Sequence, residues 1–147
     1  LGTAGALSLL ETPDEPLLVI NGDILTGVDF RAMLDFHREN EAEMTVAVHP
    51  QDFRIPYGVL DTDGTIVTGI SEKPVVRHFV NAGIYLLEPK VHQSIPSGEP
   101  SDMTEIIERI IQDGSNVVAF PIHEGWIDIG QKDHYQQAHD YASKRKK

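Results

Sequence analysis

The chain has 147 residues, 40% of them hydrophobic, which suits one domain with its own core spanning residues 1–147. It contains no cysteine, which excludes disulfides, thiolate zinc sites and cysteine catalysis, and fits a reducing cytoplasm. A formal net charge of -11 argues against nucleic acid as a partner, and no apolar run is long enough to cross a membrane.

Segments with the period of a strand alternate with segments with the period of a helix, which predicts an α/β domain. The expected strands cover residues 17–20, 44–48, 58–61, 65–67, 79–87 and 117–120, and the expected helices cover residues 4–10, 29–40, 103–113 and 132–142. The first strand is a continuous apolar run, so we expect it to be buried on both faces. We expect His49 and Pro50 to end the second strand, and Asp63-Gly64 to form the turn of a hairpin.

Capping residues mark the ends of two of these helices. Asp29 is placed as the N-cap of the helix over residues 29–40. Asp102 and Glu105 approximate a capping box before the helix over residues 103–113, and Gly114 supplies its C-terminal stop.

Two carboxylates far apart in the sequence are the main candidate site residues. Asp23 and Asp128 each follow an apolar run, so each should lie where a strand ends and a loop begins. Polar residues at such positions face the cleft in which open α/β sheets bind ligands. Together the two would form an oxygen-only site suited to Mg²⁺, although each could instead serve only as the cap of a turn.

Six short segments, spread over nearly the whole chain, carry a family resemblance when taken in this order. They are Leu1-Gly2-Thr3-Ala4-Gly5-Ala6-Leu7, Asn21-Gly22-Asp23, Tyr57-Gly58-Val59, Glu72-Lys73-Pro74, Asn81-Ala82-Gly83-Ile84-Tyr85 and Trp126-Ile127-Asp128-Ile129-Gly130. Each segment alone is a weak signal, but six in the family's order form a specific one. With them the sequence resembles the sugar nucleotidyltransferases, also called nucleotide-sugar pyrophosphorylases.

The resemblance implies a fold, a reaction and a catalytic set. The fold is a Rossmann-like mixed sheet flanked by helices, of the nucleotide-diphospho-sugar transferase type. The reaction is attack by a sugar-1-phosphate on the α-phosphorus of a nucleoside triphosphate, which gives a nucleotide sugar and pyrophosphate. Asp23 and Asp128 match the aspartates that bind Mg²⁺ in this family, and Lys73 matches the lysine that holds the sugar phosphate.

Further substrate contacts are implied by the same resemblance. Gly2 matches a glycine whose backbone lies close to the nucleobase, and Gly58 one that lets the sugar approach the main chain. Glu72 matches the acid that accepts hydrogen bonds from sugar hydroxyls, and Asn81 falls where the family makes another sugar contact. Structural roles stay open: Glu72 and Lys73 as an exposed charged pair, Asn81 as a backbone partner in a bulged strand.

One departure from the family concerns the phosphate loop. Members of the family begin with a strand and a glycine-rich loop that carries an Arg and a Lys, whereas no G-x-G spacing occurs in this sequence. The chain opens at Leu1 without a Met, and we interpret it as the C-terminal two-thirds of a nucleotidyltransferase domain. We therefore expect little or no transferase activity from it alone. We also expect an open sheet edge, or a contact between copies in a homo-oligomer.

Two other functional classes fit the same residues. A noncatalytic regulatory module of this fold would bind a nucleotide sugar without turnover. A glycosyltransferase would carry an Asp-x-Asp metal motif, a spacing found at Asp61-Thr62-Asp63, where a hairpin explains it better. Among the sugar nucleotidyltransferases, the resemblance leans toward guanylyl transfer to mannose-1-phosphate or thymidylyl transfer to glucose-1-phosphate.

Overall fold

The computed structural model describes residues 2–130. Its helices are α1 (Gly2–Gly5), the 3-10 helix η1 (Ala6–Leu9), α2 (Phe30–Glu39), α3 (Pro89–Gln93) and α4 (Met103–Gln112). Its strands are β1 (Leu17–Ile20), β2 (Ile24–Thr26), β3 (Met44–Arg54), β4 (Gly58–Asp63), β5 (Ile66–Glu72), β6 (Val75–Leu87), β7 (Val117–Pro121) and β8 (Trp126–Asp128).

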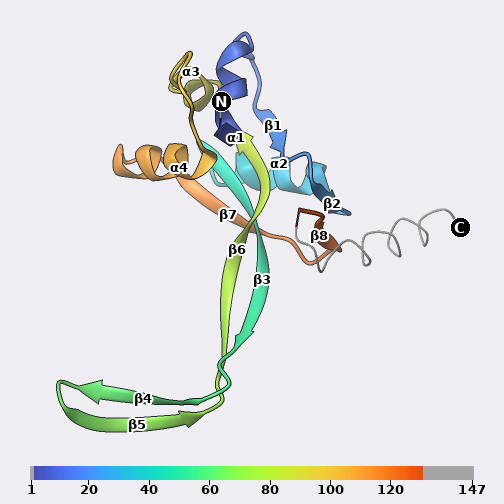
Figure 1. The fold of residues 1–147 in the computed structure, drawn as a ribbon. Coiled ribbons are helices and arrows are strands. Elements are labelled where there is room, and N and C mark those ends of the chain that lie inside the picture. The colour runs from blue at the N-terminus through green and yellow to red at the C-terminus, as the bar shows by residue number, and fades with distance from the viewer. Residues whose placement is uncertain (1, 131–147) are drawn as a thin grey trace, which may run out of the picture.

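A four-stranded sheet in the order β1-β6-β3-β7 forms the centre of the molecule. β6 runs antiparallel to β1 and β3, whereas β7 runs parallel to β3, so the sheet is mixed. Two further pairs, β2 with β8 and β4 with β5, lie outside this sheet (Figure 1). The predicted α/β class, with a mixed sheet flanked by helices, is confirmed.

Successive residues of β3 and β6 contribute to two different cores. Val46 of β3 and Tyr85 of β6 lie in one hydrophobic cluster with Met103 and Ile106 of α4. The opposite face of the same strands packs in a second cluster with Met33 of α2. Because strand side chains alternate between faces, two adjacent strands can hold helices on both sides of the sheet. The second cluster contains Val28, Met33, Ala47, Ala82, Ile84, Leu86 and Ile122.

The predicted N-terminal caps are present at both amphipathic helices, α2 and α4. Asp29 accepts hydrogen bonds through Oδ1 from the amides of Arg31 (2.9 Å) and Ala32 (3.1 Å). At α4, the amide of Asp102 donates to Glu105 Oε2 at 3.2 Å, which is the return half of a capping box. Both helices therefore begin where the sequence indicates.

Two expectations about the strands are corrected. Leu18 and Ile20 are 38% and 41% exposed, so β1 is not buried on both faces; within residues 2–130 it is an edge strand next to β6. β3 does not end at Pro50, which pairs with Phe79 of β6. Past Val48, β3 has lost β7 as a neighbour, so a residue without an amide hydrogen is tolerated there.

The extended parts of β3 and β6 form a two-stranded ribbon that carries the β4–β5 hairpin away from the helices (Figure 1). Asp63 pairs with Ile66, so the two turn residues are Gly64 and Thr65, one position later than predicted. Near the hairpin, Arg77 makes two hydrogen bonds to the carboxylate of Asp52 (2.6 and 2.9 Å), which joins the two strands of the ribbon.

Several elements among the described residues differ from the prediction. The helix expected over residues 4–10 begins earlier, as α1, and continues as the tighter η1. The short strands β2 and β8 and the helix α3 were not predicted. The helix expected over residues 132–142 lies outside the described residues. Among residues 2–130, no helix has the length and apolar character needed to cross a bilayer.

A pair of isoleucines on α4 tests this packing. Ile106 is 1% exposed and Ile111 is 54% exposed on the same helix. Ile106→Ala should lower the free energy of unfolding by about 2–5 kcal/mol, because it leaves a cavity in the core. Ile111→Ala makes the same change in helix propensity without the cavity, so urea unfolding should show little loss. Equal losses for the two variants would contradict the described orientation of α4.

Candidate metal and sugar-phosphate site

The β2–β8 pair brings Asp23 and Asp128 together from opposite ends of the described chain. Asp23 directly precedes β2, and Asp128 ends β8 opposite Ile24. The amide of Ile129 donates to the carbonyl oxygen of Asp23 at 2.9 Å, which extends the ladder by one more bond. The two aspartates are thus neighbours across a short antiparallel pair, as a shared site requires.

Gly130 shows how close the two carboxylates lie. A Cβ placed on this glycine would be 2.9 Å from Asp23 Oδ2 and 3.1 Å from Asp128 Oδ1. Both oxygens therefore lie close to the position that a side chain on Gly130 would occupy. The amide of Gly130 also donates to Asp128 Oδ1 at 2.9 Å.

The donor chemistry of this pair suits a hard divalent cation. Residues 2–130 contain no cluster of three or more metal-ligating side chains, so two carboxylates are what the described protein offers. Mg²⁺ is commonly held by one or two carboxylates, with waters and substrate phosphates as its remaining ligands. The residues present therefore fit this ion better than one that requires a closed cage of protein ligands.

Trp126 holds β8 against the central sheet. Its Nε1 donates to the carbonyl oxygen of Ala82 in β6 at 2.9 Å, and its ring stacks on His49 with a centroid distance of 5.1 Å. This anchor fixes the start of the strand that ends at Asp128. Trp126 therefore packs β8 against the sheet and helps to position the carboxylate of Asp128.

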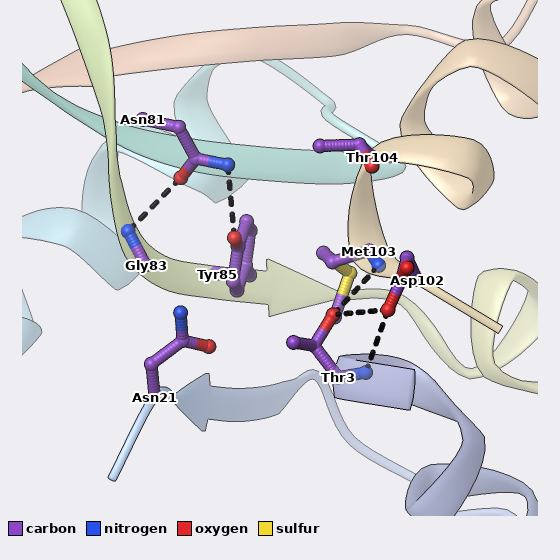
Figure 2. A pocket seen from close by; sticks show the side chains of 8 residues that line it. All are labelled: Thr3, Asn21, Asn81, Gly83, Tyr85, Asp102, Met103 and Thr104. Carbon is purple, nitrogen blue, oxygen red and sulfur yellow. Dashed lines mark hydrogen bonds between the residues drawn. The ribbon is translucent and has the colours of Figure 1, made fainter. Parts of the chain in front are cut away.

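Two adjoining pockets lead away from the carboxylates. One, of about 350 Å³, includes Asp23, and the other, of about 320 Å³, includes Asn81; both are lined by Thr3 and Asn21. The second is drawn in Figure 2, with Asn21 and Thr3 facing the β6 residues Asn81 and Tyr85. The lining is rich in amide and hydroxyl groups, the groups that recognise sugar hydroxyls through hydrogen bonds.

Asn81 lies in a bulge of β6, where the register with β3 shifts. Its Oδ1 accepts from the amide of Gly83 and its Nδ2 donates to the hydroxyl of Tyr85, both at 2.9 Å. Gly83 has φ of 70°, and a Cβ there would lie 2.7 Å from Asn21 Nδ2. The bulge thus fixes Asn81 through backbone and side-chain bonds while leaving it in the pocket wall.

Thr3 and Asp102 also line the pocket, although neither was predicted as a site residue. The amide of Thr3 donates to Asp102 Oδ1 at 2.9 Å, and its hydroxyl accepts from the amide of Met103 at 3.0 Å (Figure 2). Gly2 packs so closely here that a Cβ would clash with the carbonyl oxygen of Ser101. The N-terminal turn is thereby fastened to the start of α4.

The remaining candidates lie on the β4–β5 hairpin, apart from the carboxylates (Figure 1). Gly58 pairs with Glu72, and a Cβ on Gly58 would be 3.2 Å from Glu72 Oε2. Lys73 Nζ lies 4.0 Å from Glu72 Oε1, with both side chains mostly exposed. The structure therefore groups Gly58, Glu72 and Lys73 with one another, and does not bring them to Asp23 and Asp128.

The family of the chain follows from its sequence profile. The profile of the nucleotidyl transferase family matches residues 1–145. The chain belongs to this family. A mannose-1-phosphate guanyltransferase of Aspergillus fumigatus is 34% identical over 140 residues, which cover 89% of this chain and 38% of that protein. A UTP–glucose-1-phosphate uridylyltransferase of Synechocystis is 34% identical over an alignment 151 residues long, which covers 94% of this chain and 39% of that protein.

A solved structure supports the fold of this nucleotidyl transferase chain. HddC of Yersinia pseudotuberculosis superposes with a TM-score of 0.66 at 24% identity, covering 96% of this chain and 62% of that one. At this identity the likeness concerns the fold. The chain spans less than half the length of the two sequence relatives described above.

Tyr85 gives a pH-dependent test of the pocket wall. Burial raises the pKa of its phenol, and the hydrogen bond from Asn81 lowers that pKa by less. Because the folded pKa lies above the unfolded value of about 10, stability from the neutral phenol is present below about pH 10 and is lost as pH rises further. Tyr85→Phe should remove this alkaline loss and cost about 1 kcal/mol near neutral pH.

The measurement is urea unfolding of wild type and Tyr85→Phe, from about pH 8 to about pH 11. Other titrating groups are shared by both proteins, so the difference between the two curves reports Tyr85. A constant difference across this range would show that the phenol is not buried as described.

Proposed function

We propose that this domain transfers a nucleotidyl group from a nucleoside triphosphate to a sugar-1-phosphate, giving a nucleotide sugar and pyrophosphate. The observation that carries the proposal is the meeting of Asp23 and Asp128 across the β2–β8 pair, beside a polar pocket. The family and the names of its relatives support this reaction class.

In this proposal Asp23 and Asp128 hold Mg²⁺. When bound, the ion would neutralise phosphate charge, as divalent metals do in phosphoryl transfer. The adjoining pocket would orient the sugar through the amide of Asn81 and its polar neighbours. Orientation and charge neutralisation are the main needs of such a transfer, which requires no covalent enzyme intermediate.

Glu72 and Lys73 keep their proposed roles only if the hairpin approaches the pocket in the substrate complex. Lys73 would then hold the sugar phosphate, Glu72 would accept hydrogen bonds from sugar hydroxyls, and Gly58 would let the sugar approach the main chain. Gly2, next to Thr3 at the pocket, would contact the nucleobase. A two-stranded ribbon joins this hairpin to the body, and such a ribbon on its own is only marginally stable.

The separation of Lys73 from the two aspartates also favours a second candidate, a module that binds a nucleotide sugar without turnover. The two proposals differ in the release of pyrophosphate. A panel of nucleotide sugars, described below, tests which base and which sugar are bound. We propose guanylyl transfer to mannose-1-phosphate as the first candidate. We also propose that the protein acts in a reducing cytoplasm and as a homo-oligomer.

Thermal unfolding with a panel of nucleotide sugars, with and without Mg²⁺, tests the site. A ligand at about 100 times its dissociation constant stabilises the native state by about 2.7 kcal/mol, which raises the melting temperature. Asp23→Asn and Asp128→Asn should lose the Mg²⁺-dependent part of that rise. Asp35→Asn, at an exposed position of α2, is the matched control and should keep it.

The outcomes separate the proposals. No rise for the wild-type protein with any nucleotide sugar would overturn both of them. Because little or no transfer is expected from this chain alone, the release of pyrophosphate is measured on a protein that also carries a glycine-rich phosphate loop. A rise without release of pyrophosphate from any triphosphate and sugar-1-phosphate by that protein would favour the binding module. If the Asp23→Asn variant keeps the Mg²⁺-dependent rise in melting temperature, Asp23 does not hold the ion.

A further inference from the structure

Gly130 occupies a special place in the candidate metal site because it lies between the two carboxylates. Its amide donates to Asp128 Oδ1, and the position of its missing Cβ is 2.9 Å from Asp23 Oδ2 and 3.1 Å from Asp128 Oδ1. Real Cβ atoms essentially never approach a neighbour to less than 3.0 Å. Any larger residue here would therefore displace at least one of the two oxygens.

Space, and not backbone strain, makes glycine necessary at this position. Gly130 does not have a positive φ, so an alanine could adopt its backbone conformation. The crowded atoms are the ends of two short side chains, which can rotate away, and Gly130 itself is exposed. The cost of a Cβ thus falls on the arrangement of the carboxylates and leaves the fold largely untouched.

We infer that Gly130 is a positioning residue for the divalent cation. By lacking a side chain, it lets Asp23 and Asp128 approach each other closely enough to share one ion. By donating its amide hydrogen, it fixes the rotamer of Asp128. This inference rests on the proposed metal site and assigns a role to a residue that has no side chain of its own.

Gly22 offers a matched control on the other side of Asp23. It is also exposed and its φ is not positive, but a Cβ there would meet nothing within 4 Å. Gly22→Ala and Gly130→Ala therefore add the same methyl group and remove the same backbone freedom. Only the second adds a group between the carboxylates.

The test is a Mn²⁺ titration of the isotope-labelled chain, followed by the broadening of backbone amide signals. Mn²⁺ binds the same oxygen ligands as Mg²⁺ and broadens nearby resonances. In the wild type, broadening should centre on Ile24 and Ile129, which adjoin the two aspartates. Loss of an outer positioning group commonly weakens metal affinity by about 10- to 100-fold, and we expect this loss for Gly130→Ala.

Each outcome decides one question. Weaker binding by Gly130→Ala alone, with an unchanged dispersed spectrum, supports the inference. Equal affinity of Gly130→Ala and wild type overturns it, as does an equal loss in Gly22→Ala, which would point to backbone freedom. A wild type without broadening around the aspartates would instead overturn the metal site in the proposed function.

Discussion

The pairing of β6 with β1 and β3 is the interaction on which both the core and the site depend. One half of β6 is buried on both faces and separates the two hydrophobic clusters. The bulge within the same strand places Asn81 in the pocket wall, and the carbonyl oxygen of Ala82 anchors Trp126. The strand that holds the core therefore also positions β8, and through β8 the carboxylate of Asp128.

The two groups of candidate residues are supported differently. Asp23 and Asp128 are fixed by a backbone ladder, and Thr3 by its bonds to the start of α4. The hairpin with Glu72 and Lys73 is joined to the body through a ribbon of two strands. Groups that bind an ion gain from the first arrangement, because a preorganised site has little ordering left to do. In the proposed function, the second arrangement would let Glu72 and Lys73 approach the pocket with the substrate.

Local patterns predicted much of the fold, and they singled out Asp23 and Asp128, which the structure brings together. The caps at Asp29 and Asp102 depend on neighbouring residues, so the sequence was sufficient to find them. The extension of β3 past Pro50 could not be predicted, since it depends on which neighbour strand remains there. The role of Thr3 depends on a contact with Asp102, which is far along the chain. The position of the hairpin depends on how the β3–β6 ribbon bends. No local pattern reports either of these.

The β2–β8 pair has a consequence for the kinetics of folding. It joins segments from the two ends of the described chain, so it closes a long loop, and such contacts are slow to form. Contacts absent from the folding transition state act mainly on the rate of unfolding. A ligand held between Asp23 and Asp128 would therefore prolong the lifetime of the native state without hastening its formation.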